Sequence, residues 1–457
     1  MKKSLFIMII GMIFSIGVWI GGTVWIDQGK EQVEVTESVL YGEVEKAKGI
    51  SLRIDTQWEE KLFWSTSYSV GTLDQPKTTF QVQNRNKKKG GFWKTEEIVL
   101  EMDMPAWFVT EGREGISLEG LPYAEIFRDV AGRTEAGEER TEEVYLADYY
   151  RIYPLRLEVQ SEKISCMIIP EDAGERVTQF FQIPVLPEHR GKVSVRKNEK
   201  GEVIRVQYEN LEGELWIRTS GVVSDTGCYF SFVCYQGERM LDTLKIESGM
   251  YVLPFYWEME EGQETAVMEY EKLTCMYPLE AQTAVLGLQE EEKDGERFLI
   301  IVKEKEKLVL FVIEKETGVL LQRMEVAEWE EGDMFQSLEQ QENQLLITME
   351  DGAICFLVKD QMGYYQKKVE GNFDRIEKLW ERNMLVLGHS FQWDGKRLAV
   401  AGFPYNQQNS VYLAVFEEEG MVFLGFYQHS GDLDWKLGLE GIRNPIRSVG
   451  KPVLEIR

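Results

Sequence analysis

The side chains best suited to acid–base chemistry are three histidines, His189, His389 and His429. His429 is close to Ser430 and Asp432, which are residue types that hydrolases use together. Neighbours in one turn cannot converge as a nucleophile, its base and an orienting group must. For His429 the pattern therefore favours a loop histidine that is hydrogen-bonded to backbone groups. Nucleophile-elbow, P-loop and β-lactamase motifs are absent from the sequence, and no catalytic residue is predicted.

A tyrosine-rich segment, YLADYYRIY, supplies the candidate binding residues. It contains Tyr145, Tyr149, Tyr150 and Tyr153. Aromatic rings of this kind could stack on a sugar or a peptide, and packing between strands is the alternative that stays open.

Carboxylates are too abundant to single out a catalytic pair, because spacing in the fold would have to select two of the 78 acids. Asp351, Asp432 and Asp434 could in principle bind calcium, but no loop repeats acidic ligands at the spacing of a calcium loop. CxxC and HExxH are also missing. We therefore expect no metal site and no cofactor.

Five cysteines are too few and too scattered for a disulfide framework. In GCYFSFVC, strand alternation places Cys228, Phe230, Phe232 and Cys234 on one face, with the two sulfurs too far apart to bridge. Cys355 lies in the apolar run AICFLV. These cysteines are expected to be small core residues, so the fold must be held by its core.

The elements that would position these residues are mostly strands. Short segments rich in aromatic and β-branched residues, such as ISLRIDTQW, KVSVRK and NSVYLAVF, alternate with turn residues from about residue 50 onward. Two helices are expected, one in YAEIFRDVAGR after Pro122 and one in GERVTQFF. Asp394 and Gly395 predict a tight hairpin turn.

The C-terminal half contains a repeat. LVLFVIEKETG (308–318) aligns without gaps on AICFLVKDQMG (353–363), and VYLAVFEEEG, ending at Gly420, is a shorter version. A period of about 45 residues built from hairpin-linked strands is typical of a β-propeller blade. We expect a mainly β protein with one propeller-like domain of seven or eight irregular blades. A separate β-rich domain ending near residue 190, followed by a smaller propeller, is the alternative.

The N-terminus predicts a membrane anchor. Residues 5–26 carry no charge and are mostly apolar. A helix of this length can cross a bilayer core of about 30 Å. A cleaved signal peptide is the alternative. Basic residues precede this segment and acidic residues follow it, so we expect a cytoplasmic tail (1–4), a transmembrane helix (5–26), a polar stalk with a possible short helix (27–49) and an extracytoplasmic domain (50–457).

The formal charge of −27 restricts the function. A surface this acidic repels phosphate backbones and anionic headgroups, so nucleic-acid binding and peripheral docking on anionic lipid are not expected.

Three stretches also resemble an uncharacterised group of membrane-anchored extracytoplasmic proteins of Gram-positive bacteria: ISLRIDTQWEEKLFWSTSYSVG, LPYAEIFRDVAGRTEAGEERTEEVYLADYYRIYPLRLEV and GCYFSF. The resemblance implies a membrane-anchored topology and no particular activity.

Together these features favour a membrane-anchored extracytoplasmic binding module with a sensing, assembly or regulatory role. Its partner would be a protein or an envelope polymer. Two alternatives stay open: an envelope-associated hydrolase acting on glycan or peptide, and an inert structural spacer.

Overall fold

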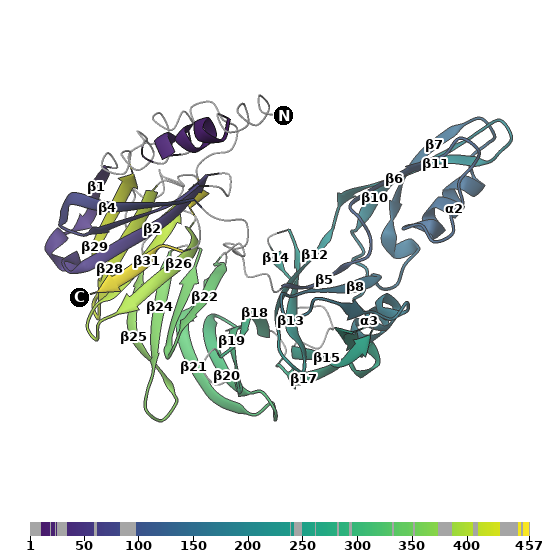
Figure 1. Cartoon of the computed structure of the whole chain (residues 1–457). Coiled ribbons are helices and arrows are strands. Elements are labelled where there is room, and N and C mark those ends of the chain that lie inside the picture. Colours follow the sequence, from purple (N-terminus) through teal and green to yellow (C-terminus); the bar gives the residue numbers. More distant parts are fainter. Residues whose placement is uncertain are drawn as a thin grey trace. The chain divides into compact units, whose positions relative to one another are not determined.

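In the computed structural model, the chain folds into two compact units, one built from residues 1–94 and 333–457 and the other from residues 95–332 (Figure 1). It describes residues 11–18, 20–22, 24, 34–58, 62–82, 97–237, 239–241, 249–260, 262–280, 283–291, 295–330, 333–350, 352–372, 386–404, 410–429, 447–448 and 451–456.

Three sheets have the strand order of propeller blades, because four consecutive strands pair antiparallel with their neighbours in the chain. One sheet contains β18 (Thr283–Glu290), β19 (Arg297–Glu304), β20 (Lys307–Glu314) and β21 (Leu320–Glu328). The second contains β22 (Phe335–Gln341), β23 (Gln344–Met349), β24 (Ala353–Lys359) and β25 (Tyr365–Asn372). The third contains β26 (Val386–Trp393), β27 (Leu398–Pro404), β28 (Ser410–Glu417) and β29 (Gly420–His429).

The sequence repeat corresponds to one position in these sheets. Its three copies form β20, β24 and β28, and each is the third strand of its sheet. The mainly β character and the blade-like strand order are confirmed, and the number of seven or eight blades stays a prediction. The domain limits also stay predictions; residue 190 begins a strand inside the second unit.

In the first unit, segments from both ends of the sequence complete the sheets. β1 (Val35–Gly42) pairs antiparallel with β29 as a fifth strand. The remaining sheet contains β2 (Ile50–Trp58), β3 (Leu62–Ser69) and β4 (Thr72–Val82), with β30 (Arg447–Ser448) and β31 (Val453–Ile456) paired to β2.

Part of the expected stalk thus lies in a sheet, and the expected helix there is a strand followed by the short 3-10 helix η2 (Val44–Ala47). Ala47 is fully buried against the apolar residues of β2, which explains why this polar segment is ordered.

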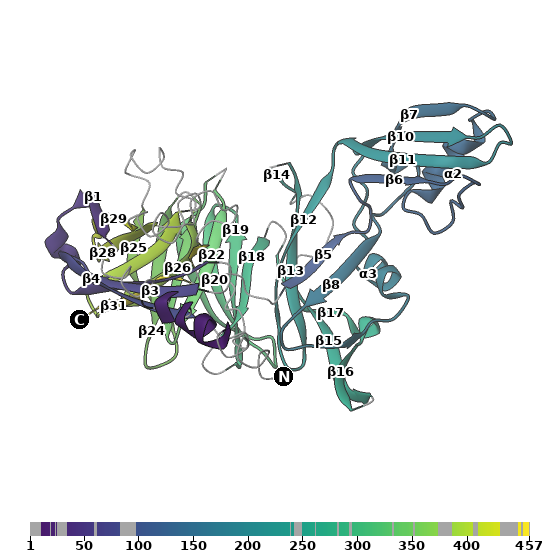
Figure 2. The same ribbon diagram turned by 45° about the horizontal axis from the view of Figure 1, so that its top comes forward.

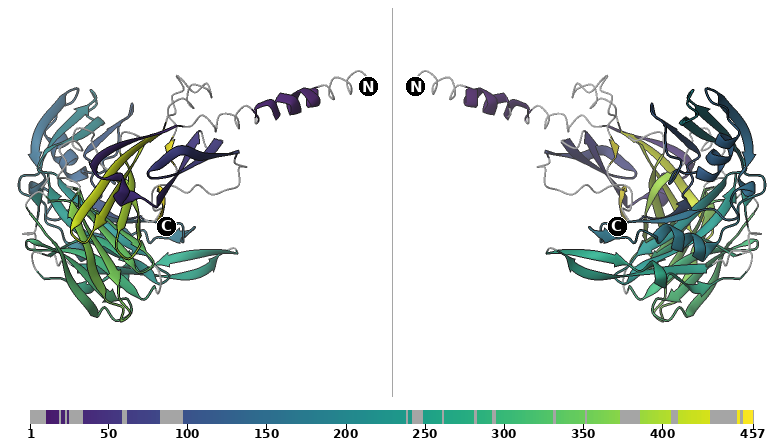
Figure 3. Two further views of the ribbon diagram at one scale, coloured as in Figure 1. Left: turned by 90° about the vertical axis from the view of Figure 1, so that its left-hand side faces the viewer. Right: turned by 90° about the vertical axis from the view of Figure 1, so that its right-hand side faces the viewer.

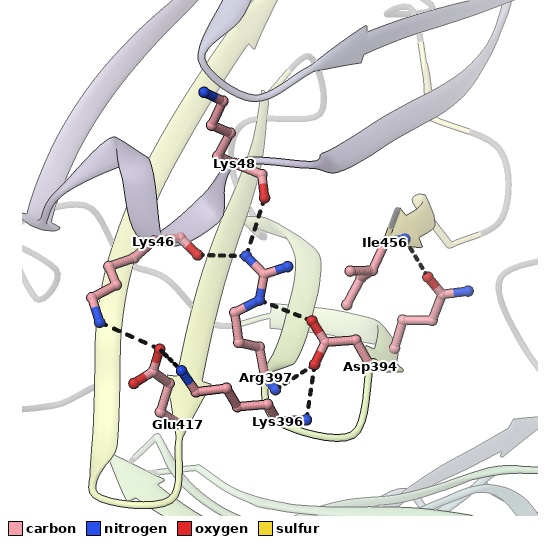
Figure 4. Close-up of polar contacts among 8 residues, drawn as sticks. Lys46, Lys48, Asp394, Lys396, Arg397, Glu417 and Ile456 are labelled. Atoms are coloured by element: carbon pink, nitrogen blue, oxygen red, sulfur yellow. Dashed lines mark hydrogen bonds and ion pairs between the residues drawn. The ribbon is translucent and has the colours of Figure 1, made fainter.

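A hairpin turn secures this N-terminal segment (Figure 4). Asp394 Oδ1 accepts the backbone N–H groups of Lys396 and Arg397, and Gly395 has a φ of 97°, as the predicted hairpin requires. Arg397 Nη1 donates to the carbonyl oxygens of Lys46 and Lys48 at 3.0 and 3.1 Å. One guanidinium therefore holds the chain between η2 and β2.

The C-terminal strand is fixed to the same hairpin, because Gln392 Oε1 accepts the backbone N–H of Ile456 at 2.7 Å.

The second unit contains three further sheets and both expected helices, α2 (Ala124–Gly132) and α3 (Ala173–Phe181). β6 (Trp107–Glu111), β11 (Val203–Glu212), β10 (Arg190–Lys197) and β7 (Glu139–Tyr145) form a four-stranded sheet in that order. β12 (Leu215–Val223), β13 (Gly227–Gln236), β15 (Gly249–Glu260), β16 (Gln263–Met268) and β9 (Met167–Ile168) form a longer one, to which β14 (Arg239–Met240) and β17 (Thr274–Pro278) are added. β5 (Glu97–Met102) pairs with β8 (Leu155–Gln160), and η3 (Leu146–Asp148) and η4 (Tyr270–Lys272) are single turns.

The predicted cysteine positions on β13 are confirmed. Cys228, Phe230 and Cys234 are buried in one apolar cluster with Phe232 packed against it, while Tyr229 points into a different cluster. Burial raises the pKa of the Cys228 and Cys234 thiols to about 12.

Near the N-terminus, residues 11–18, 20–22 and 24 are helical, and the other residues of the expected span at 5–26 lie outside the described part of the chain. Within the described part, no helix combines the length and apolar character needed to cross a bilayer.

Candidate functional site

The four-stranded sheet of β6, β11, β10 and β7 has one covered face and one open face. Val193, Val195, Val206 and Tyr208 point to the covered face and are fully buried. Helix α2 packs there through an apolar stripe consisting of Ile126, Phe127, Val130 and Ala131. Figure 2 shows α2 lying along this face of the sheet.

The opposite face exposes a tryptophan. Strand alternation turns Trp107 of β6 away from the covered face, and its side chain is 60% exposed. In the strand register Trp107 lies opposite Glu209 of β11, which lies opposite Lys192 of β10. Leu211, at the bulge of β11 two residues beyond Glu209, is exposed as well. The described residues place no helix or strand over this surface, which we call the open face.

Two arginines lie side by side on the open face. Arg196 of β10 and Arg205 of β11 are opposite each other, with Glu139 and Glu111 opposite them on the outer strands. Arg196 Nη2 donates to Glu111 Oε1 at 2.6 Å. Arg205 Nη2 donates to Gln207 Oε1 at 3.1 Å and forms no ion pair with any residue that the structure describes. The face therefore carries a cation, planar polar side chains and, four residues further along β11, an aromatic ring, a combination that suits binding.

Behind the covered face, a buried hydrogen-bond chain contains His189. Tyr153 Oη and His189 Nδ1 are 2.8 Å apart, and the same hydroxyl accepts the backbone N–H of Leu186. His189 Nε2 is 3.1 Å from Asn210 Oδ1, which also accepts the Tyr208 hydroxyl at 2.7 Å. Because the amide oxygen only accepts, Nε2 carries the proton and Nδ1 accepts from Tyr153.

Burial favours the neutral form of His189. Burial lowers its pKa below the ordinary value of 6.5, and the hydrogen bond to Asn210 opposes that shift only in part. The His189 ring is hydrogen-bonded to side chains from two segments, Tyr153 before β8 and Asn210 of β11, and so links them.

The four predicted binding tyrosines do not form one surface. Tyr153 is fully buried, so its ring cannot stack on a ligand. Tyr149 donates to Asp129 Oδ2 at 2.6 Å, and burial followed by that carboxylate raises its pKa to about 12. Tyr150 packs against the core, while Tyr145 at the end of β7 is exposed. For Tyr145, Tyr149 and Tyr150 the binding role stays a prediction.

The other two histidines, His389 and His429, lie on β26 and β29, the first and last of the four consecutive strands of one sheet. His389 lies on β26 and is buried, and its Nδ1 has no hydrogen-bond partner among the described residues. Burial, with Lys451 adding to it, lowers the pKa of His389 to about 3. His429 ends β29, but its side chain and the neighbouring Ser430 and Asp432 lie outside what the structure describes.

One serine and one lysine meet in the second unit. Lys315 Nζ donates to Ser224 Oγ and to Glu290 Oε1, and it lies 5.9 Å from the centre of the Tyr229 ring. Hydrolases can pair serine with lysine, but there the lysine accepts the serine proton. An ammonium held in an ion pair by Glu290 is a donor, so this contact links β18 to the loops after β12 and β20.

Among the described residues, no group of three or more histidine, cysteine, aspartate or glutamate side chains could hold a metal ion. Sequence reasoning missed Trp107, Arg196 and Arg205. Alternation in KVSVRK and VIRVQY does separate polar from apolar positions. The register that pairs Arg205 with Arg196 is not encoded in either segment alone.

Comparisons with known proteins add little. No protein-family model and no curated protein matches the chain. Among solved structures, Kluyveromyces lactis Hsv2 is 8% identical, covers 86% of this chain and 99% of its own, and has a TM-score of 0.28. The β-propeller domain of Myceliophteria thermophila Cps50 (Swd1) is 12% identical, covers 52% of this chain and 70% of its own, and has a TM-score of 0.25. A Lactobacillus plantarum protein is 7% identical, covers 55% and 84%, and has a TM-score of 0.26. TM-scores this low support no argument about the chain.

Proposed function

We propose that this chain is a membrane-anchored extracytoplasmic binding module with a sensing, assembly or regulatory role, and that it recognises its partner through the open face. The observation that carries the proposal is the sheet with α2 on one side and exposed Trp107 on the other. Covering an exposed indole removes more apolar area from water than covering any smaller side chain of that face. Arg205 also has hydrogen-bond capacity left for a ligand.

The anchor part of the proposal rests on the sequence. The apolar residues 5–26 and the basic residues that precede them favour a single span with the two folded units outside the cytoplasm.

Matched tryptophan variants test the binding site. Trp107→Ala and Trp216→Ala each remove an indole that is about equally exposed, 60% and 59%, but only Trp107 lies on the open face. The full-length chain and both variants are used to capture partners from envelope extracts. We expect Trp107→Ala to lose the partner and Trp216→Ala to keep it, with Arg205→Glu weakening capture. Equal capture by the wild type and both tryptophan variants contradicts the assignment of the open face.

The same proteins are assayed on peptidoglycan and model glycosides. Turnover by the wild type would favour the hydrolase, and neither capture nor turnover would favour the spacer.

A further inference from the structure

The β15–β16 hairpin carries its apolar face beyond the end of the core. Phe255 and Ala266 are buried in the large cluster of the second unit. Further along β15, on the same face as Phe255, Trp257 is 42% exposed and Met259 is 68% exposed. The Trp257 ring meets the Phe255 ring edge to face, with centroids 5.5 Å apart. The exposed pair is therefore a continuation of the core face that nothing in the described structure covers.

The hairpin projects from its sheet, as the end of β15 and β16 show in Figure 2 and the teal-green hairpin shows in the side views of Figure 3. In the register, Trp257 lies opposite Ala266 and Met259 lies opposite Glu264. Met167 of β9, half-buried, lies beside Ala266 on the other side. Ala266 itself is fully buried, while the Trp257 ring opposite it stays 42% exposed and can be covered by a side chain from outside.

The tip of the β15–β16 hairpin carries charge of one sign. Residues 258–264 contain four glutamates and no basic residue. Glu264 is exposed, lies directly beside Met259, and makes no ion pair with any described residue. An apolar surface bordered by an unpaired carboxylate favours a ligand that is both apolar and basic, because an acidic one would add repulsion.

We propose that the Trp257 face of the β15–β16 hairpin docks a basic amphipathic polypeptide segment of a partner protein. The apolar side chains of that segment cover Trp257 and Met259, and a lysine or arginine of the segment pairs with Glu264. This surface is separate from the open face, so the two proposals can fail independently.

Neighbouring residues on opposite faces of the hairpin provide matched controls. Tyr256 is 44% exposed, close to the value for Trp257, but points to the other face, as does Glu258. The probes are a fluorescent peptide of alternating leucine and lysine and its leucine–glutamate counterpart. Binding to the full-length chain in non-ionic detergent is followed by anisotropy, with protein-free micelles as the blank.

We expect the basic peptide to bind and the acidic one not to bind. Trp257→Ala and Met259→Ala should each weaken binding about tenfold, the loss typical of a central contact residue, while Tyr256→Ala changes it less than twofold. Glu264→Lys should weaken binding most at low salt, where charges are least screened, and more than Glu258→Lys does. Glu264→Lys replaces an exposed side chain and keeps the test valid if Trp257→Ala perturbs folding.

Three results would each overturn the proposal. Equal binding to wild type and Trp257→Ala would mean that the peptide simply associates with an acidic protein. Equal losses from Tyr256→Ala and Trp257→Ala would remove the preference for one face. Binding of the acidic peptide would remove the role of charge.

Discussion

His389 should make the first unit sensitive to mild acid. It is 3% exposed on β26, its Nδ1 lacks a partner among the described residues, and the ring of Tyr412 stands edge to face at 6.3 Å. Burial and then the positive charge of Lys451 lower its pKa to about 3. In the unfolded chain the same imidazole should titrate near 6.5.

The direction of the effect follows from where protons bind. Between pH 6.5 and about 3 the unfolded chain holds a proton that the folded chain excludes, so the free energy of unfolding falls as the pH falls. Above pH 6.5 both forms are neutral and this contribution is fully present. From pH 7 to pH 5, the two pKa values give a loss of about 2 kcal/mol from this one side chain.

Urea unfolding at pH 7, 6 and 5 measures this loss in the wild type and in His389→Gln, which cannot titrate. Carboxylates contribute to the pH dependence of both proteins, so the difference between the two isolates the histidine. We expect the wild type to lose about 2 kcal/mol more than the variant over this range. Parallel curves, within about 0.5 kcal/mol, would show that His389 is hydrated or protonated in the folded chain and would refute the reasoning.

Three further outcomes are expected. Arg397→Ala should lower the free energy of unfolding by about 2 to 4 kcal/mol and open residues 43–49 to limited proteolysis, because two backbone carbonyls lose a charged donor. Arg397→Lys should lower it less. Unchanged stability and unchanged cleavage in Arg397→Ala would contradict the role of this contact. Reducing agent should leave the melting temperature nearly unchanged, since none of the five cysteines forms a disulfide in the structure; a drop of many degrees would contradict this. The protein should stay in the membrane fraction after alkaline carbonate washing, with its folded part removed by protease from wall-stripped cells; a soluble form beginning near residue 24 would reject the anchor.

Local patterns predicted the elements that depend on local physics. The repeat identified the third strand of three sheets because a strand buried on both faces requires a continuous apolar run. Pro122 and the apolar spacing of residues 126–131 located α2, and Asp394 with Gly395 located a turn. These signals are read within a few residues, where backbone preferences decide the outcome.

Contacts between distant segments could not be read in this way. β1 looks like a polar stalk because five of its eight residues are exposed, and its pairing partner β29 lies some 390 residues later. The open face likewise depends on the register of β10 against β11, and a slip of one residue would turn Arg205 inward. Nothing within the tyrosine segment indicates that the Tyr153 ring belongs to the buried His189 network.

If residues 5–26 anchor the chain, as we propose, the incorporation of β1 into a sheet shortens the tether between the bilayer and the protein. Only residues 27–34 separate the apolar segment from Val35, where pairing with β29 begins. Eight extended residues reach at most ~28 Å, about the thickness of the hydrocarbon core itself. An anchored molecule would therefore search a thin layer next to the membrane, and a partner embedded in that membrane would meet it at a far higher local concentration than one in the surrounding medium.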